Sequence, residues 1–128
     1  MLERLRITNL ALVESADLVF APGLNAITGE TGAGKSLLVS SVNLLVGARA
    51  DGDEVREGRT AATIEGEFRL DGPLAARAGR LLGEWGIEFD GETVIVKREV
   101  QAGGRSRATV NQSAVTLAGL KRLGEILV

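Results

Sequence analysis

The chain has 128 residues, which suits one domain with a single core, and its 45% apolar and 25% charged content is that of a folded globular protein. It contains no cysteine and no histidine, which excludes disulfides and argues against transition-metal sites. The net charge is -2, so the chain as a whole is not basic and any contact with DNA has to be local. The sequence has no run of 18 apolar residues and no leader-like N-terminus, so a cytoplasmic location is expected.

The chain begins with a strand pattern. Apolar and charged residues alternate over residues 2–9, and residues 11–20 continue in a second extended pattern, so two strands joined by a turn are predicted. Pro22 and Gly23 mark a further turn, because proline fixes φ and glycine accepts a positive φ. The short apolar run over residues 24–28 is then the third predicted strand.

A phosphate-binding motif follows this third strand. Residues 29–36 match G-x-x-x-x-G-K-S, the P-loop pattern, and residues 35–46 form a mostly apolar predicted helix. Backbone N–H groups of such a loop face one anion, Lys35 reaches the β- and γ-phosphates, and the Ser36 hydroxyl binds Mg²⁺. The candidate nucleotide-binding residues are Gly29, Glu30, Thr31, Gly32, Ala33, Gly34, Lys35, Ser36 and Leu37. The alternative without a binding function is a glycine-rich turn before an ordinary helix.

The sequence around the motif limits which classes of P-loop protein fit the chain. Its place after the third strand argues against small GTPases and simple nucleotide kinases, and favours ATPase heads with antiparallel strands ahead of the motif. The chain lacks an acidic residue at the end of an apolar strand, which P-loop enzymes use to hold Mg²⁺ and orient water. It also lacks N-K-x-D, D-x-x-G and an L-S-G-G type signature. No catalytic residue is therefore assigned, and half of a composite site is expected.

A polar loop is predicted over residues 48–60, after Gly47 ends the helix. Arg49 and Arg56 in this loop are candidates to approach the phosphates or an opposing head, with a solvated loop as the alternative. An acidic cluster in the same loop lacks the spacing of a Ca²⁺-binding EF-hand, so solvated charge is expected. It consists of Asp51, Asp53 and Glu54.

The second half alternates strands and helices. Residues 62–70 have the period-two pattern of a half-buried strand, and an amphipathic helix is predicted from Pro73 to Trp85, with Trp85 in the core. Residues 93–100 and 105–111 form a predicted hairpin, and a final helix follows Thr116 as its N-cap. Basic hairpin residues could touch DNA phosphates, or belong to a solvated sheet face. They are Lys97, Arg98, Arg105 and Arg107.

Residues 2–13 and 23–36 resemble the start of the bacterial RecN family of DNA-repair ATPases, relatives of the SMC (structural maintenance of chromosomes) proteins. The resemblance covers nearly the whole chain. P-loops alone are shared by many families, so the part of the resemblance that is specific to this family is the P-loop combined with Gly47-x-Arg49-Ala50 and Val55-Arg56-x-Gly58.

This resemblance implies an ABC-type head folded from the two ends of a long chain with an antiparallel coiled coil between them. Residues 1–128 are then its N-terminal lobe, an α/β unit with a mixed sheet, antiparallel strands, a hairpin and the P-loop helix. The Q-loop is expected just past Val128, and the signature and Walker B elements beyond the coiled coil.

The implied cofactors are ATP and Mg²⁺. The implied partners are the C-terminal lobe of the same head, a second head engaged through ATP, and DNA through the complete protein, with no membrane. The implied role is double-strand break repair in the cytoplasm, at the nucleoid, and this fragment alone is expected to lack ATPase activity.

The chain departs from the family pattern at two turns. Ala11 stands where many SMC relatives have a basic residue near the nucleotide, so that contact is not expected. Asn111-Gln112 replaces the usual Asn-Gly, which weakens the prediction of a tight turn. The alternatives to an ATPase head are a stand-alone P-loop small-molecule kinase and a nucleotide-switched DNA-binding module.

Overall fold

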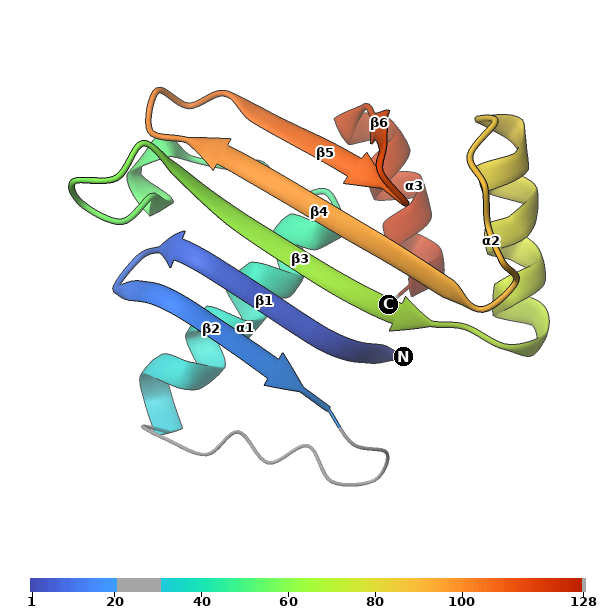
Figure 1. Cartoon of the computed structure of the whole chain (residues 1–128), viewed down its shortest axis with the longest axis horizontal. Helices are drawn as coiled ribbons and strands as arrows, with labels where there is room; N and C mark the ends of the chain where they lie inside the picture. The colour runs from blue at the N-terminus through green and yellow to red at the C-terminus, as the bar shows by residue number, and fades with distance from the viewer. Residues whose placement is uncertain (21–30, 128) are drawn as a thin grey trace.

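The computed structural model describes residues 1–20 and 31–127, the side chains of residues 31–36 excepted. Six strands in this part of the chain form one antiparallel sheet in the order β2-β1-β3-β4-β5-β6 (Figure 1). The strands are β1 (Leu2–Leu10), β2 (Val13–Val19), β3 (Ala61–Arg69), β4 (Thr93–Gln101), β5 (Ser106–Val110) and β6 (Ser113–Val115). The antiparallel component expected from the sequence is thus confirmed.

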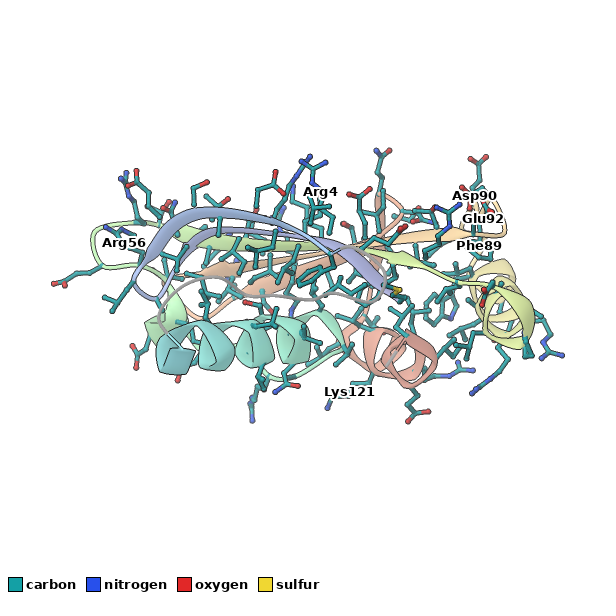
Figure 2. All side chains as sticks on the ribbon, turned by 90° about the horizontal axis from the view of Figure 1, so that it is seen from below. Arg4, Arg56, Phe89, Asp90, Glu92 and Lys121 are labelled. Atoms are coloured by element: carbon teal, nitrogen blue, oxygen red, sulfur yellow. The ribbon has the colours of Figure 1, made fainter. Side chains whose placement is uncertain are left out.

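Helices cover one face of this sheet. The helices are α1 (Thr31–Leu45), α2 (Gly72–Glu84) and α3 (Leu117–Leu127), with a short 3-10 helix, η1 (Gly52–Glu54), after α1. Figure 2 shows α1 and α3 in one layer beneath the sheet, with α2 at the end of the sheet. The opposite face of the sheet carries charged side chains and, in the described ranges, no helix.

The period-two patterns of the strands place the core between the sheet and the helices. Every second residue of β3 and β4 points into this layer and is almost fully buried. The inward residues of the two strands include Ala62, Ile64, Phe68, Val94, Val96 and Val100. Helices α1 and α3 complete the core with Leu44, Leu45, Leu120 and Leu123.

The outward face of the sheet is arranged in rows of alternating charge. In one row Asp17, Arg6, Glu65 and Lys97 follow one another on β2, β1, β3 and β4. The bidentate pair between Arg4 and Asp17 reinforces the sheet edge, with Arg4 Nη2 2.6 Å from Asp17 Oδ2. This hydrogen bond to Arg4 is the main reason that the pKa of Asp17 is lowered.

The two turns at which the chain departs from the family pattern, at Ala11 and at Asn111-Gln112, are both tight. Ala11 has a φ of 51° in the β1–β2 turn, which lies where the turn was predicted. The β5–β6 turn consists of Asn111 and Gln112 with φ of 47° and 73°, and Val110 pairs with Ser113 across it. Successive positive φ angles are those of a type I′ turn. The tight turn therefore forms even though a glutamine replaces the usual glycine.

The predicted strands and helices of the described residues are confirmed. The strand pairs β1–β2 and β4–β5, helix α2 after Asp71, and helix α3 lie where the sequence placed them. The Thr116 hydroxyl accepts the amide of Gly119 at 3.0 Å, so Thr116 caps α3 as expected. Strand β6 and helix η1 were not predicted. The predicted strand over residues 24–28 lies outside the described residues.

Candidate nucleotide-binding site

The start of α1 carries most of the predicted phosphate-binding motif. Gly29 and Glu30 lie outside the described residues, while Thr31 to Ser36 form the first turns of α1 as part of Thr31–Leu45. The first N–H groups of a helix have no partner within it and give that end a partial positive charge, so this backbone fits a phosphate group. Leu37, the last residue predicted for the site, packs partly buried against the core.

The first turn of α1 lies at the same end of the sheet as two other predicted features. Figures 1 and 2 show the β1–β2 turn and the loop of Arg56 at this end, with α1 on the helical side of the sheet. The loop pairs with the turn through two backbone hydrogen bonds, from Ala11 N to Glu54 O at 2.7 Å and from Arg56 N to Asn9 O at 2.8 Å. This end of the sheet therefore holds a fixed framework of two segments, the β1–β2 turn and the loop of Arg56.

Arg56 fastens this framework with its side chain. Its Nη1 donates to the carbonyl of Leu12 at 2.6 Å, and the residue is half-buried rather than fully solvated. Arg49 lies on the exposed surface of the loop. In the acidic cluster, Asp51 Oδ1 accepts the amide of Asp53 at 3.0 Å and so caps η1. The described residues contain no group of three side chains placed to hold a metal ion.

The sequence prediction for Arg98 is wrong. Instead of lying on the exposed face of the hairpin, Arg98 is 1% exposed and lies beneath the sheet. Its Nη1 donates to the carbonyls of Leu44 and Ala48, each at 2.7 Å, and its Nη2 lies 3.2 Å from Ser106 Oγ. The pattern could have revealed this, because Arg98 has the same register as the inward Val94, Val96 and Val100.

The carbonyls that Arg98 binds belong to the C-terminal end of α1. Gly47 has a φ of 104° there, and the amides of Gly47 and Ala48 return to the carbonyls of Leu44 and Asn43 at 3.3 Å and 2.9 Å. This is a Schellman motif, which confirms Gly47 as the residue that ends the helix. The guanidinium thus adds a charged donor at the negative end of the helix dipole.

The other basic residues of the hairpin are exposed, but acidic residues accompany them. Lys97 faces Glu65 on β3, and Arg107 faces Glu99 on β4. Arg105 is exposed at the start of β5. The mixed charge of this face favours a solvated sheet surface over a track for DNA phosphates. Contact of Lys97, Arg105 and Arg107 with DNA stays a hypothesis.

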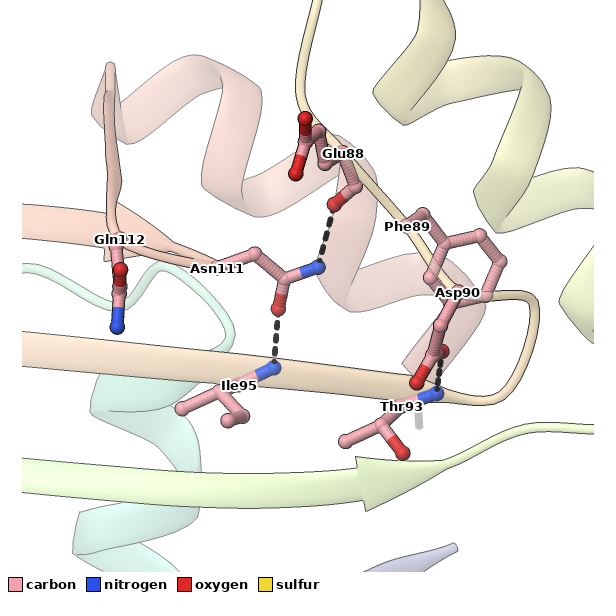
Figure 3. A pocket seen from close by; sticks show the side chains of 7 residues that line it. All are labelled: Glu88, Phe89, Asp90, Thr93, Ile95, Asn111 and Gln112. Atoms are coloured by element: carbon pink, nitrogen blue, oxygen red, sulfur yellow. Dashed lines mark hydrogen bonds between the residues drawn. The ribbon is translucent and has the colours of Figure 1, made fainter.

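A hollow elsewhere in the molecule is lined by residues with structural roles (Figure 3). Asn111 Oδ1 accepts the amide of Ile95 at 2.8 Å, and its Nδ2 donates to the carbonyl of Glu88 at 2.9 Å. Asp90 accepts the amides of Glu92 and Thr93, each at 2.8 Å, and these bonds, the one from Thr93 first, lower its pKa. These polar groups hold β4 and β5 in place. Sequence reasoning had not assigned them a role.

Comparison with known proteins defines the class of this molecule. The family model described as an AAA domain matches residues 4–125, so the chain belongs to that family. The P-loop motif and the fold agree with this class. Within the part of the chain that the structure describes, no helix is long and apolar enough to cross a membrane.

The relatives within this class confirm the resemblance to RecN. The chain is 37% identical over 127 residues to the DNA repair protein RecN of Bacillus subtilis, covering 99% of this chain and 22% of the relative. It is 39% identical over 128 residues to that of Vibrio cholerae, covering 100% of this chain and 23% of the relative. The chain thus spans about a fifth of the length of these relatives.

The fold is that of SMC-type ATPases. A structure solved in work on ATP-driven dimerisation and DNA-stimulated activation of SMC ATPases superposes with a TM-score of 0.74 at 19% identity. The match covers 98% of this chain and 78% of that one. At this identity the likeness shows the fold, and it confirms the predicted fold class.

Proposed function

We propose that this chain is the ATP-binding N-terminal lobe of a RecN-type ATPase head that acts in DNA double-strand break repair. The observation that carries the proposal is the P-loop motif at the start of α1, in a chain whose sequence relatives are RecN proteins. The family match and the fold favour this function over a stand-alone small-molecule kinase or a switched DNA-binding module.

In this proposal residues 29–37 bind ATP. The backbone amides from Gly29 to Gly34 and the positive end of α1 face the phosphates, Lys35 adds a charge toward the β- and γ-phosphates, and Ser36 holds Mg²⁺. Mg²⁺ supplies charge neutralisation between the phosphate oxygens when it is bound. Arg49, exposed on its loop, and Arg56, with four guanidinium N–H groups beyond the one that binds Leu12, are further candidates for contact with nucleotide or with an opposing head.

Three partners belong to the proposal. The C-terminal lobe of the same head supplies the signature and Walker B elements that this chain lacks. Apolar side chains on α1 and β2 support a covering lobe, since Val39 is 58% exposed and Val19 is 75% exposed. A second head engages through ATP, and DNA binds through the complete protein, which we place in the cytoplasm at the nucleoid.

The half-site proposal is tested by ATP turnover. The 128-residue chain alone should show no ATPase activity above a Lys35→Ala control, because the acidic element that orients water is supplied by the other lobe. Joining the chain to the C-terminal lobe should give turnover and ATP binding, and Lys35→Ala should abolish both. Lys97→Ala, an exposed lysine on the sheet, is the matched control and should change neither. Lys35-dependent turnover by the chain alone would contradict the proposal that it holds only half of the ATPase site. Unchanged ATP affinity in Lys35→Ala would contradict the proposal that the motif binds ATP.

A further inference from the structure

The end of α1 opposite the phosphate-binding motif is anchored to the sheet by one buried side chain. Arg98 on β4 is 1% exposed and donates from Nη1 to the carbonyls of Leu44 and Ala48, each at 2.7 Å. Its Nη2 lies 3.2 Å from the hydroxyl of Ser106 on the neighbouring strand β5. Arg98 therefore joins the last turn of α1, and Ala48 in the segment that follows it, to two strands.

Helix α3 encloses the same end of α1 from another side. A Cβ on Gly124 would lie 2.7 Å from both Cβ and the carbonyl oxygen of Val46, so the two backbones are in direct contact. A Cβ on Gly47 would lie 2.5 Å from Cγ of Lys121. Arg98 and α3 therefore contact this end of the helix from two sides.

The chemistry at this point is unusual for a residue that only stabilises the core. Burying a cation carries a desolvation cost, and the inward positions of β4 on either side of Arg98 hold valines. Among the described residues, no carboxylate lies within 4.0 Å of the guanidinium, so its direct partners are the carbonyls at the helix end, with the charge of Glu54 acting on it from farther away. An apolar residue would fill this position without that cost. A cationic donor adds direction, because one nitrogen, Nη1, holds two carbonyls at once.

Because an α-helix is stiff, fixing the position of one end also fixes the position of the other end. Helix α1 has 15 residues, so it is a rod of about 22 Å with the phosphate-binding turn at one end and Arg98 at the other. A shift of the anchored end along the helix axis moves the amides of the first turn by the same amount. Phosphate binding by backbone amides depends on their exact placement.

We propose that Arg98 is a positioning residue for ATP: by fixing the C-terminal end of α1, it sets where the N-terminal end of α1 meets the phosphates. The proposal rests on the proposed function of the motif, since it needs the first turn of α1 to bind nucleotide. Arg98 itself does not touch the nucleotide, because it lies at the other end of the helix.

The test is ATP affinity in the complete protein that contains this chain. Calorimetry with ATP and Mg²⁺ should show about tenfold weaker binding for Arg98→Met, below the roughly 100-fold that a 1 Å misplacement can cost a reaction rate. Lys97→Met changes the adjacent, exposed residue of β4 and should leave the affinity unchanged. Arg98→Lys keeps a cationic nitrogen with three N–H donors, which can bind the same two carbonyls, so this variant should bind ATP within about threefold of the unchanged protein. All variants are compared at a temperature at which circular dichroism shows them folded.

A second measurement needs no variant. Coupling between two sites is reciprocal, so if the anchor favours ATP about tenfold, ATP must favour the anchored state by the same factor. In the unchanged protein, ATP should therefore slow hydrogen exchange at the amides of Gly47 and Ala48 by up to about tenfold, while amides of α2 exchange at an unaltered rate.

The outcomes separate the two proposals. If the unchanged protein binds no ATP, the proposed function fails. If it binds ATP and a folded Arg98→Met variant binds equally well, the positioning role of Arg98 is refuted. If that variant does not fold, ATP-independent exchange at Gly47 and Ala48 in the unchanged protein refutes it instead. Weakened binding with rescue by lysine supports it, as does slowed exchange at these two amides.

Discussion

Replacing Gly124 with alanine should destabilise the chain, even though alanine is the better helix former. Gly124 lies within α3, where alanine gains about 1 kcal/mol from helix propensity. The added Cβ would lie 2.7 Å from the carbonyl oxygen of Val46 and 3.1 Å from its Cα. These atoms are backbone and belong to the anchored end of α1, so they cannot rotate away. Overpacking costs about 1–3 kcal/mol, and a contact this short with fixed backbone belongs at the upper end of that range. After the gain of about 1 kcal/mol from helix propensity is subtracted, we expect a net loss of about 2 kcal/mol.

The matched control is Gly83 near the end of α2. No atom lies within 4 Å of a Cβ built on Gly83, so Gly83→Ala should gain stability through propensity alone, by about 0.5–1 kcal/mol. In thermal unfolding, a loss of 2 kcal/mol corresponds to about 6–10 °C for a domain of this size. Gly124→Ala should thus melt lower and Gly83→Ala higher than the unchanged chain. A Gly124→Ala variant that melts as high as Gly83→Ala would refute the close contact between α1 and α3.

Two further predictions concern turns and pH. Gln112 has a φ of 73° in a type I′ turn, so Gln112→Gly should raise the free energy of unfolding by about 0.5–1 kcal/mol in urea titrations; a loss of stability would contradict the assigned turn. The pair with Arg4 lowers the pKa of Asp17 below its ordinary value of 3.8, so its contribution is present above pH 3.8 and is lost as the pH falls through the lower folded-state pKa. Asp17→Asn should therefore destabilise the chain slightly at pH 7, and this difference should shrink as the pH falls below 3.8; a difference that stays constant would point to a cause other than ionisation.

Much of the fold could be predicted because the sheet has one buried face. Alternation over residues 62–70 identified β3, and Gly103 with Gly104 identified the β4–β5 turn. The Thr116 cap and Gly47 gave two helix ends correctly, since both signals depend on local backbone geometry. Elements whose patterns are local and repeated are therefore the predictable ones.

The roles of single polar residues were less predictable, because they depend on contacts between distant segments. Arg56 binds the carbonyl of Leu12, which is 44 positions away along the chain, and nothing near Arg56 in the sequence indicates that partner. Arg98 had a usable signal in its inward register, but its charge suggested an exposed position. For the P-loop, the motif itself could be found from its residue spacing, and the structure adds the anchored C-terminal end of α1, which lies outside the motif.

The order of strands in the sheet also bears on how the molecule folds. Most neighbouring strands are close in the chain, but β1 pairs with β3 across residues 11–60, a segment that includes α1. Closing such a long loop is slower than forming a hairpin, because more chain entropy is lost before any contact forms. The hairpins should therefore form early, and α1 should pack against the sheet only when β1 and β3 have paired. The end of the helix that we propose to bind phosphate is then completed late in folding, by a pairing between strands that are not part of the motif.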